Sequence, residues 1–289
     1  REMTGTHRMT GQEPQFIEVG TGIARRRIAY RRESRASQGK PGLLWLSGFK
    51  SDMASTKATA LADYAADRGN DCVRFDYSGH GLSDGPFESG TIGRWLEEAE
   101  AVFRSAANGP QVIVGSSMGG HIALLLLKRL LAMDPSEARR IAALILIAPA
   151  WDMTEELMWK RFPAEARRAL ETEGVYFEPS NYGEPYTITR ALIEDGRHHL
   201  LAREPFDPGR PVHILQGLQD QDVPASHVHE LKSFLKGGHV RLTEVPDGEH
   251  RLSRPQDLAL LFQLIDEVAM SSPTDSPKPP EPDSRPDRA

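Results

Sequence analysis

VIVGSSMGGHIAL, residues 112–124, is the segment that indicates the fold of this chain most clearly. Its first residues are an apolar strand pattern, its last residues are a helical pattern, and G-x-S-x-G lies between them as Gly115, Ser117 and Gly119. A serine at such a sharp turn stands exposed above the carboxyl end of a sheet, and small neighbours keep its strained backbone free of collisions. The stretch therefore predicts a nucleophile elbow, with Ser117 at its centre as the nucleophile.

Segments on both sides of the elbow alternate between strand and helix patterns. Strands are predicted at 42–48, 71–77, 111–116, 142–149, 212–217 and 239–245, and helices at 53–69, 91–109, 121–133, 225–236 and 255–269. Such alternation is typical of an α/β fold in which helices cover both faces of a mostly parallel sheet. Residues 15–33 predict an antiparallel hairpin at the edge of that sheet.

The segment 151–210 interrupts the alternation, because a plain crossover between parallel strands needs only a dozen or more residues. Long insertions of this kind are often functional lids, so we expect a small cap before the penultimate strand. Trp151, Met153 and Met158 are candidates for lining an acyl pocket. Packing of the cap onto the sheet is an equally good interpretation of these residues.

Composition limits the classes of protein that are possible. A net charge of −6 argues against a nucleic-acid partner, and we interpret the arginines at 25–27 and 31–32 as a solvated strand face. A single cysteine, Cys72, excludes a disulfide framework and a thiolate metal cluster. The longest apolar stretch, 141–151, is too short to span a membrane.

The ends of the chain differ from the part between them. Residues 1–14 are polar and unpatterned, and 271–289 are rich in proline, serine and charge, so we expect both to be disordered. No linker interrupts the alternation between them. We therefore expect one domain over 15–270.

A serine hydroxyl needs a base, and histidine is the usual one. In folds with such an elbow, the acid and then the histidine follow the nucleophile along the chain. His250, in EVPDGEHRLS (244–253), lies just after the last strand pattern and is the predicted base. His213 is interpreted as a buried strand residue, and the pair His227 and His229 as poor metal ligands, since they face different ways. His80, in the loop after a strand, could line the pocket, but we interpret it as a turn residue.

The oxyanion that forms during acyl transfer needs two preorganised N–H donors. Met118 follows the nucleophile and is expected to supply one. The loop after the strand 42–48 is expected to supply the other, from the Phe49 amide. The acid follows the strand 212–217 in GLQDQDVP (217–224), where, from the residues alone, either Asp220 or Asp222 could orient the histidine.

Several motifs together resemble the α/β hydrolase family. They are GSSMGG (115–120), LSGFKSDMASTKA (46–58), VRFDYSGHGLSDG (73–85), TRALIEDGRHHLL (189–201) and GEHRLS (248–253). More narrowly they resemble the branch of α/β-hydrolase-domain protein ten, which contains a mitochondrial palmitoyl-protein thioesterase and acyl-glucuronide esterase. The resemblance covers roughly residues 40–265.

The resemblance implies an α/β-hydrolase fold and selects the acid. The acid loop of the family has a glycine, an aspartate three residues later and then Val-Pro, which match Gly217, Asp220, Val223 and Pro224. Asp220 then takes the catalytic position, and Asp222 is left to favour the dipole of the following helix.

The implied activity is that of a serine hydrolase that cleaves carboxylic ester or thioester bonds of a small molecule through an acyl-enzyme. It needs no metal or organic cofactor. Lipases, peptidases and C–C bond hydrolases share the serine and remain alternatives, as does a catalytically silent binding protein. The N-terminal residues do not resemble a mitochondrial transit peptide, so we expect a bacterial cytoplasmic protein, with the mitochondrial matrix as the alternative. The sequence does not indicate an oligomeric state.

Overall fold

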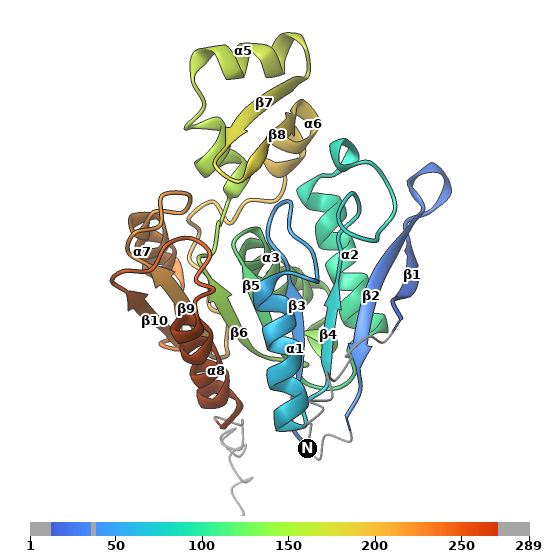
Figure 1. Cartoon of the computed structure of the whole chain (residues 1–289), viewed down its shortest axis with the longest axis vertical. Coiled ribbons are helices and arrows are strands. Elements are labelled where there is room, and N and C mark those ends of the chain that lie inside the picture. Colours follow the sequence, from blue (N-terminus) through green and yellow to red (C-terminus); the bar gives the residue numbers. More distant parts are fainter. Residues whose placement is uncertain (1–12, 36–38, 271–289) are drawn as a thin grey trace, which may run out of the picture.

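The computed structural model describes residues 13–35 and 39–270. The predicted disordered tail 271–289 and residues 1–12 of the N-terminal segment lie outside these described residues. Figure 1 shows a central sheet flanked by helices, with a separate small layer, the cap, above one end of the sheet.

The central sheet has eight strands in the order β1-β2-β4-β3-β5-β6-β9-β10. The strands are β1 (Gln15–Val19), β2 (Arg26–Glu33), β3 (Gly42–Leu46), β4 (Cys72–Phe75), β5 (Gln111–Ser116), β6 (Ile141–Ile147), β9 (Val212–Gly217) and β10 (Val240–Val245). All neighbours from β4 to β10 pair in parallel, whereas β1 and β2 form the predicted antiparallel edge hairpin. The predicted mostly parallel sheet is confirmed.

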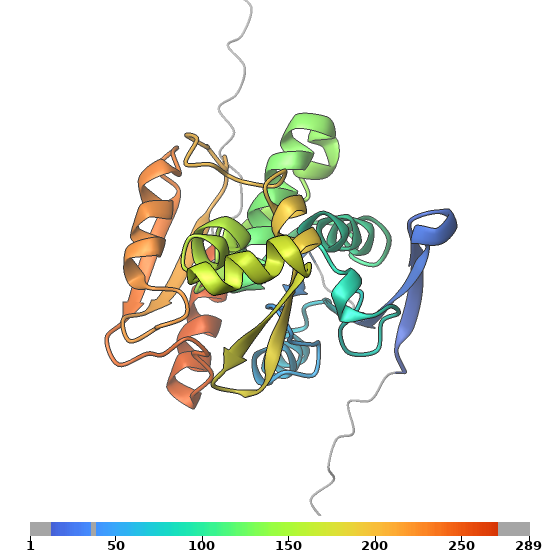
Figure 2. The same cartoon turned by 90° about the horizontal axis from the view of Figure 1, so that it is seen from above.

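Helices cover both faces of the sheet, because alternate side chains of each strand point to opposite faces. In β3, Leu43 and Trp45 pack in one hydrophobic cluster, whereas Leu44 and Leu46 pack in a second cluster on the other face of the sheet. Figure 2, seen from above, shows helices on both sides of the sheet. The helices outside the cap are α1 (Thr56–Arg68), α2 (Ile92–Ser105), α3 (Met118–Met133), α4 (Pro135–Ala138), α7 (Ala225–Phe234) and α8 (Pro255–Met270), and two short 3₁₀ turns are η1 (Gly22–Ala24) and η2 (Phe87–Ser89).

Helix α3 begins at Met118, earlier than the pattern from His121 predicted. Glycine is a poor helix former, so Gly119 and Gly120 did not indicate the first turn of this helix in the sequence. The elbow turns directly into the helix, so the amide groups of its first turn lie beside Ser117.

The predicted cap lies between β6 and the penultimate strand β9. It consists of the π-helix η3 (Met153–Trp159), α5 (Ala164–Thr172), the hairpin β7 (Val175–Ser180) and β8 (Gly183–Thr189), and α6 (Arg190–Gly196). Its beginning and end are joined at Asp152, whose carboxylate accepts hydrogen bonds from the amides of Leu201 (2.7 Å) and Ala202 (2.9 Å). This junction places the cap over the carboxyl ends of the central strands (Figure 1). Within the described residues, no helix is long and apolar enough to cross a membrane.

Candidate active site

Ser117 lies in a strained turn between β5 and α3. Its φ of 56° and ψ of −115° fall outside the regions that residues other than glycine favour. Its amide donates to the Ile147 carbonyl of the neighbouring strand at 2.8 Å, which holds the turn in place. A Cβ atom on Gly119 would lie 2.1 Å from the Leu46 carbonyl oxygen, so only glycine allows α3 to approach β3 this closely.

The loop after β9 fixes Asp220 by local hydrogen bonds. Its Oδ1 accepts from the amides of Asp222 (2.9 Å) and Val223 (2.8 Å), and its Oδ2 lies 2.7 Å from Nδ1 of His250. The Asp220 side chain is fully buried, whereas His250 is one-fifth exposed. A buried carboxylate that is satisfied on one oxygen by backbone donors keeps a fixed direction for the other, so it can hold the imidazole in one orientation.

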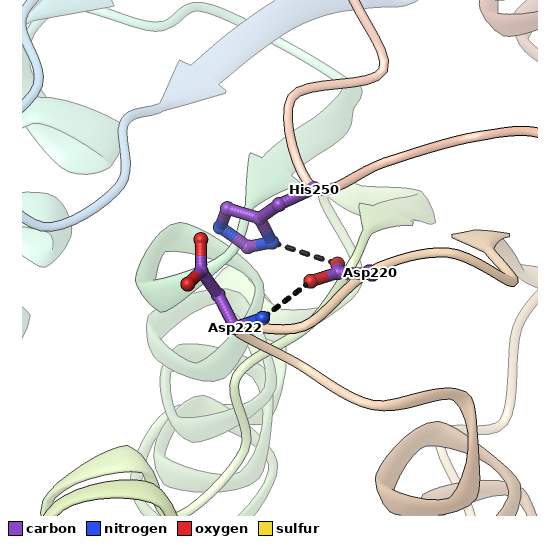
Figure 3. Close-up of side chains that lie close together, drawn as sticks. All are labelled: Asp220, Asp222 and His250. Carbon is purple, nitrogen blue, oxygen red and sulfur yellow. Dashed lines mark hydrogen bonds and ion pairs between the residues drawn. The ribbon is translucent and has the colours of Figure 1, made fainter. Parts of the chain in front are cut away.

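Asp222 takes a different position, shown in Figure 3. Asp220 is bonded to one ring nitrogen of His250, whereas the exposed Asp222 carboxylate lies toward the opposite edge of the ring. The Tyr182 hydroxyl at the tip of the cap hairpin donates to Asp222 Oδ2 at 3.3 Å, and Arg161 donates to the Asp222 carbonyl at 2.9 Å. Asp222 therefore connects the acid loop to the cap.

Ser117 and His250 line one cavity of about 820 Å³ between the sheet and the cap. Among the hydrogen bonds of the described part of the chain, none joins the Ser117 hydroxyl to His250. Hydrogen bonds of this kind are often long in a substrate-free site and form when substrate binds. The structure therefore brings Ser117, Asp220 and His250 to one place, with only the last two in direct contact.

The cap supplies an apolar wall to this cavity, and Met153 and Met158 are both part of it. Trp151 is not among the lining residues. Its ring is fully buried and stacked on His227 at 4.2 Å, and its indole nitrogen donates to the His227 carbonyl at 2.7 Å. Trp151 thus packs the base of the cap onto α7. It does not line the acyl pocket for which the sequence made it a candidate.

The loop after β3 approaches the elbow from the other side. A Cβ atom on Gly48 would lie 3.5 Å from Cβ of Ser117, and Phe49 lines the same cavity as the serine. The Phe49 ring packs edge-on against Phe87, Trp95 and Tyr186, which anchors this loop. Gly48, which precedes the Phe49 amide, thus lies close to Ser117, and the Met118 amide follows Ser117 directly in the chain.

Basic side chains that the sequence did not single out also line the cavity. They are Lys50, Lys57, Arg161 and Arg251. Lys57, from α1, donates to the Arg251 carbonyl and to Ser253 Oγ (3.3 Å), so it ties α1 to the loop that carries His250. Arg251 lies over the Tyr182 ring at 4.3 Å. The local sequence pattern does not indicate that these residues line the cavity, because each of them contacts a partner that is distant in the sequence.

Burial lowers the pKa of Lys57 to about 8, from an ordinary value of 10.5. Between these two values the unfolded chain binds more protons at this position, so the contribution of Lys57 to stability rises with pH. We expect the free energy of unfolding of the wild type, relative to that of Lys57→Met, to increase between pH 7.5 and 9.5. Urea denaturation at both pH values measures this difference, and a difference that does not change with pH would contradict the expectation.

Asp220, Asp222 and His250 are also the one group of described residues with the spacing of a metal site, since their ligand atoms lie within 4.8 Å of one another. Both Asp220 oxygens are already used by the loop amides and by His250. Within this group, Asp220 therefore has protein partners on both of its oxygens, and one of these partners is His250.

Comparison with known proteins identifies the family of this chain. The sequence profile described as the alpha/beta hydrolase family matches residues 41–259, and the chain belongs to this family. Its relatives include the protein named palmitoyl-protein thioesterase ABHD10, mitochondrial, of Homo sapiens. The two are 32% identical over 230 residues, which are 79% of this chain and 72% of the human protein. The predicted family and its branch are thus confirmed.

Two solved structures share the whole fold. A putative hydrolase from Agrobacterium vitis S4 is 44% identical with a TM-score of 0.86, and the match covers 89% of this chain and 98% of that one. Alpha/beta hydrolase domain-containing protein 10 from mouse is 29% identical with a TM-score of 0.76, over 89% and 99% of the two chains. The cap and the sheet therefore belong to one common architecture.

Proposed function

We propose that this chain is a serine hydrolase that cleaves carboxylic ester or thioester bonds of small molecules through an acyl-enzyme. The observation that carries the proposal is the hydrogen bond of 2.7 Å between Asp220 and His250, at the cavity that also holds the strained elbow of Ser117. The names of the ABHD10 relatives as thioesterases support the same class of substrate.

In the proposed first step, Ser117 Oγ attacks the substrate carbonyl while His250 Nε2 accepts its proton. Asp220 accepts from Nδ1–H, which fixes the tautomer and stabilises the imidazolium that forms. The amides of Met118 and Phe49 donate to the oxyanion. These donors belong to the backbone of a packed helix start and an anchored loop, so little reorganisation is needed as charge develops.

In the second step, His250 protonates the leaving alcohol or thiol and then removes a proton from the water that attacks the acyl-enzyme. The product acid leaves and Ser117 regains its proton. This cycle requires no metal or organic cofactor. A serine nucleophile is also used by lipases, peptidases and C–C bond hydrolases, and these remain alternatives. A catalytically silent binding protein is disfavoured, because binding alone does not require the contact between Asp220 and His250.

The apolar wall of the cap is proposed to bind the acyl chain. Met158 is buried and lines the cavity, so Met158→Trp should shorten the space for that chain. We expect kcat/KM for long-chain p-nitrophenyl esters to fall about 10-fold or more relative to the acetate, since each methylene in an apolar pocket contributes about 1–3 kcal/mol.

Measuring kcat/KM over a series of acyl lengths, for esters and for thioesters, tests this assignment. Met133→Trp is the matched control, because Met133 is exposed at the end of α3. The same chain-length profile in wild type and Met158→Trp would exclude this wall as the acyl site. The series also shows which of the two bond types is preferred.

We further propose a cytoplasmic location in a bacterium, with the mitochondrial matrix as the alternative. The likeness to the Agrobacterium vitis protein, at 44% identity, supports the first location. The names of the mammalian relatives, which are mitochondrial proteins, support the second.

A further inference from the structure

The sequence pattern favoured a turn role for His80, and both nitrogens of its ring are engaged in the structure. Nδ1 lies 3.0 Å from the Ser78 carbonyl oxygen, and Nε2 lies 3.0 Å from the amide nitrogen of Lys50. A carbonyl can only accept, so Nδ1 carries the hydrogen and Nε2 accepts from the Lys50 amide. Burial lowers the pKa of His80, which keeps this neutral tautomer.

The amide that His80 holds belongs to an unfavourable turn. Gly48 to Ser51 form a turn closed by the Ser51 amide, which donates to the Gly48 carbonyl at 3.2 Å. Its third residue, Lys50, has a φ of 58°, in the left-handed region that a type II turn assigns to glycine. Rotation of the Phe49–Lys50 peptide would relieve this strain, and it would also turn the Lys50 N–H away from His80.

This turn determines the direction of the Phe49 amide. The Gly48 carbonyl points to Ser51, and in a trans peptide the N–H of the next residue points the opposite way. Gly48 lies against Ser117, so the direction of the Phe49 N–H near the elbow depends on the bond that the Gly48 carbonyl accepts from the Ser51 amide. Oxyanion donors must lie about 2.7–3.1 Å from the oxygen, so a small change in the turn removes the donor.

His80 itself is held rigidly. The amides on either side of it in its loop are fixed by buried carboxylates, since Ser78 donates to Glu98 at 2.9 Å and Leu82 donates to Asp76 at 2.9 Å. Its ring lies edge-on to the rings of Phe87 and Trp95, each at 5.3 Å. A rigid acceptor of this kind can hold a strained amide in one orientation.

We propose that His80 is a positioning residue, whose Nε2 accepts from the Lys50 amide and thereby keeps the 48–51 turn in the form that directs the Phe49 N–H to the oxyanion. The proposal rests on the serine hydrolase function proposed above. It assigns His80 no contact with the substrate, so its effect passes through the turn and should appear in the transition state rather than in substrate binding.

The test combines His80 variants that lack the Nε2 acceptor with a Lys50 variant that relieves the strain of the 48–51 turn. His80→Phe fills the aromatic site but cannot accept, and we expect it to lower kcat for a p-nitrophenyl ester about 10- to 100-fold with little change in KM. The Ki of an alkylboronic acid, which mimics the tetrahedral intermediate, should rise by the same factor. His80→Gln keeps an acceptor and should lose less than His80→Phe.

Lys50→Gly separates a positioning role from a merely structural one. Glycine adopts the left-handed conformation freely, so in the His80→Phe background it should restore a large part of kcat. The same substitution in the wild type gives the reference for the double-mutant cycle. If His80→Phe does not fold, His80→Leu, which also lacks an acceptor, takes its place in the cycle.

Three results would overturn the proposal: an unchanged kcat in folded His80→Phe, a loss confined to KM, or equal effects of Lys50→Gly in both backgrounds. Each of them leaves the hydrolase function intact when the wild type turns over ester. Absence of both turnover and fluorophosphonate labelling in the wild type would contradict the hydrolase function itself.

Discussion

Ser117→Ala is expected to lower kcat for a p-nitrophenyl ester by about 10⁶-fold, to the level that binding and the oxyanion donors alone sustain. The nucleophile forms the covalent intermediate, so nothing else in the site replaces it. The substitution should leave the fold unchanged, because Ser117 is held by its backbone amide and not by its hydroxyl. Steady-state kinetics on purified protein with a native circular dichroism spectrum measures the loss.

Ser116→Ala is the matched control, since the two serines are adjacent and both line the cavity. Only Ser117 has the positive φ of the elbow, so the control should keep its turnover. Turnover retained in folded Ser117→Ala, or lost only in Ser116→Ala, would contradict the assignment of the nucleophile.

Asp220→Asn is expected to lower kcat by about 10⁴-fold, as loss of the acid does in a comparable triad. The amide presents an N–H donor to a ring nitrogen that must itself donate, so His250 adopts the wrong tautomer. KM should change far less than kcat, because Asp220 is buried beneath the histidine and does not line the cavity.

Asp222→Asn is the natural comparison, two residues away in the same loop. Its carboxylate contacts the cap tyrosine Tyr182 and makes no hydrogen bond to His250 among the described contacts. We expect little loss of turnover. The reverse order of effects would mean that the acid loop acts through Asp222, and the proposed mechanism would have to be rebuilt around the exposed carboxylate.

The fold could be predicted from the sequence because its signals are local. The strand before the elbow, the glycines around Ser117 and the alternation of apolar segments each report a structure formed within a few residues. The position of His250 after the last parallel strand follows from the same logic, since the carboxyl ends of parallel strands meet at one edge of the sheet.

The choice between Asp220 and Asp222 needed more than the residues. Both follow β9 closely, and composition does not distinguish them. The structure distinguishes them by their hydrogen bonds. Asp220 accepts hydrogen bonds from the amides of Asp222 and Val223, in a local turn of the kind that aspartate favours. The resemblance to the family indicated the same residue.

The lining of the cavity and the support of the oxyanion loop could not be predicted. Apolar residues at the start of the cap serve equally for a pocket or for packing, and Trp151 packs while Met153 and Met158 line the cavity. The contact of His80 with Lys50 joins two loops from neighbouring strands, and no pattern within either loop records it.

In the proposed mechanism, Ser117 becomes covalently modified during turnover. The most direct measurement is peptide mapping by mass spectrometry after the wild type reacts with a fluorophosphonate. We expect a single phosphonyl adduct, placed by fragmentation on Ser117, and none in Asp220→Asn at matched short reaction times. An adduct on another residue, or no adduct on folded wild type that hydrolyses esters, would contradict this mechanism.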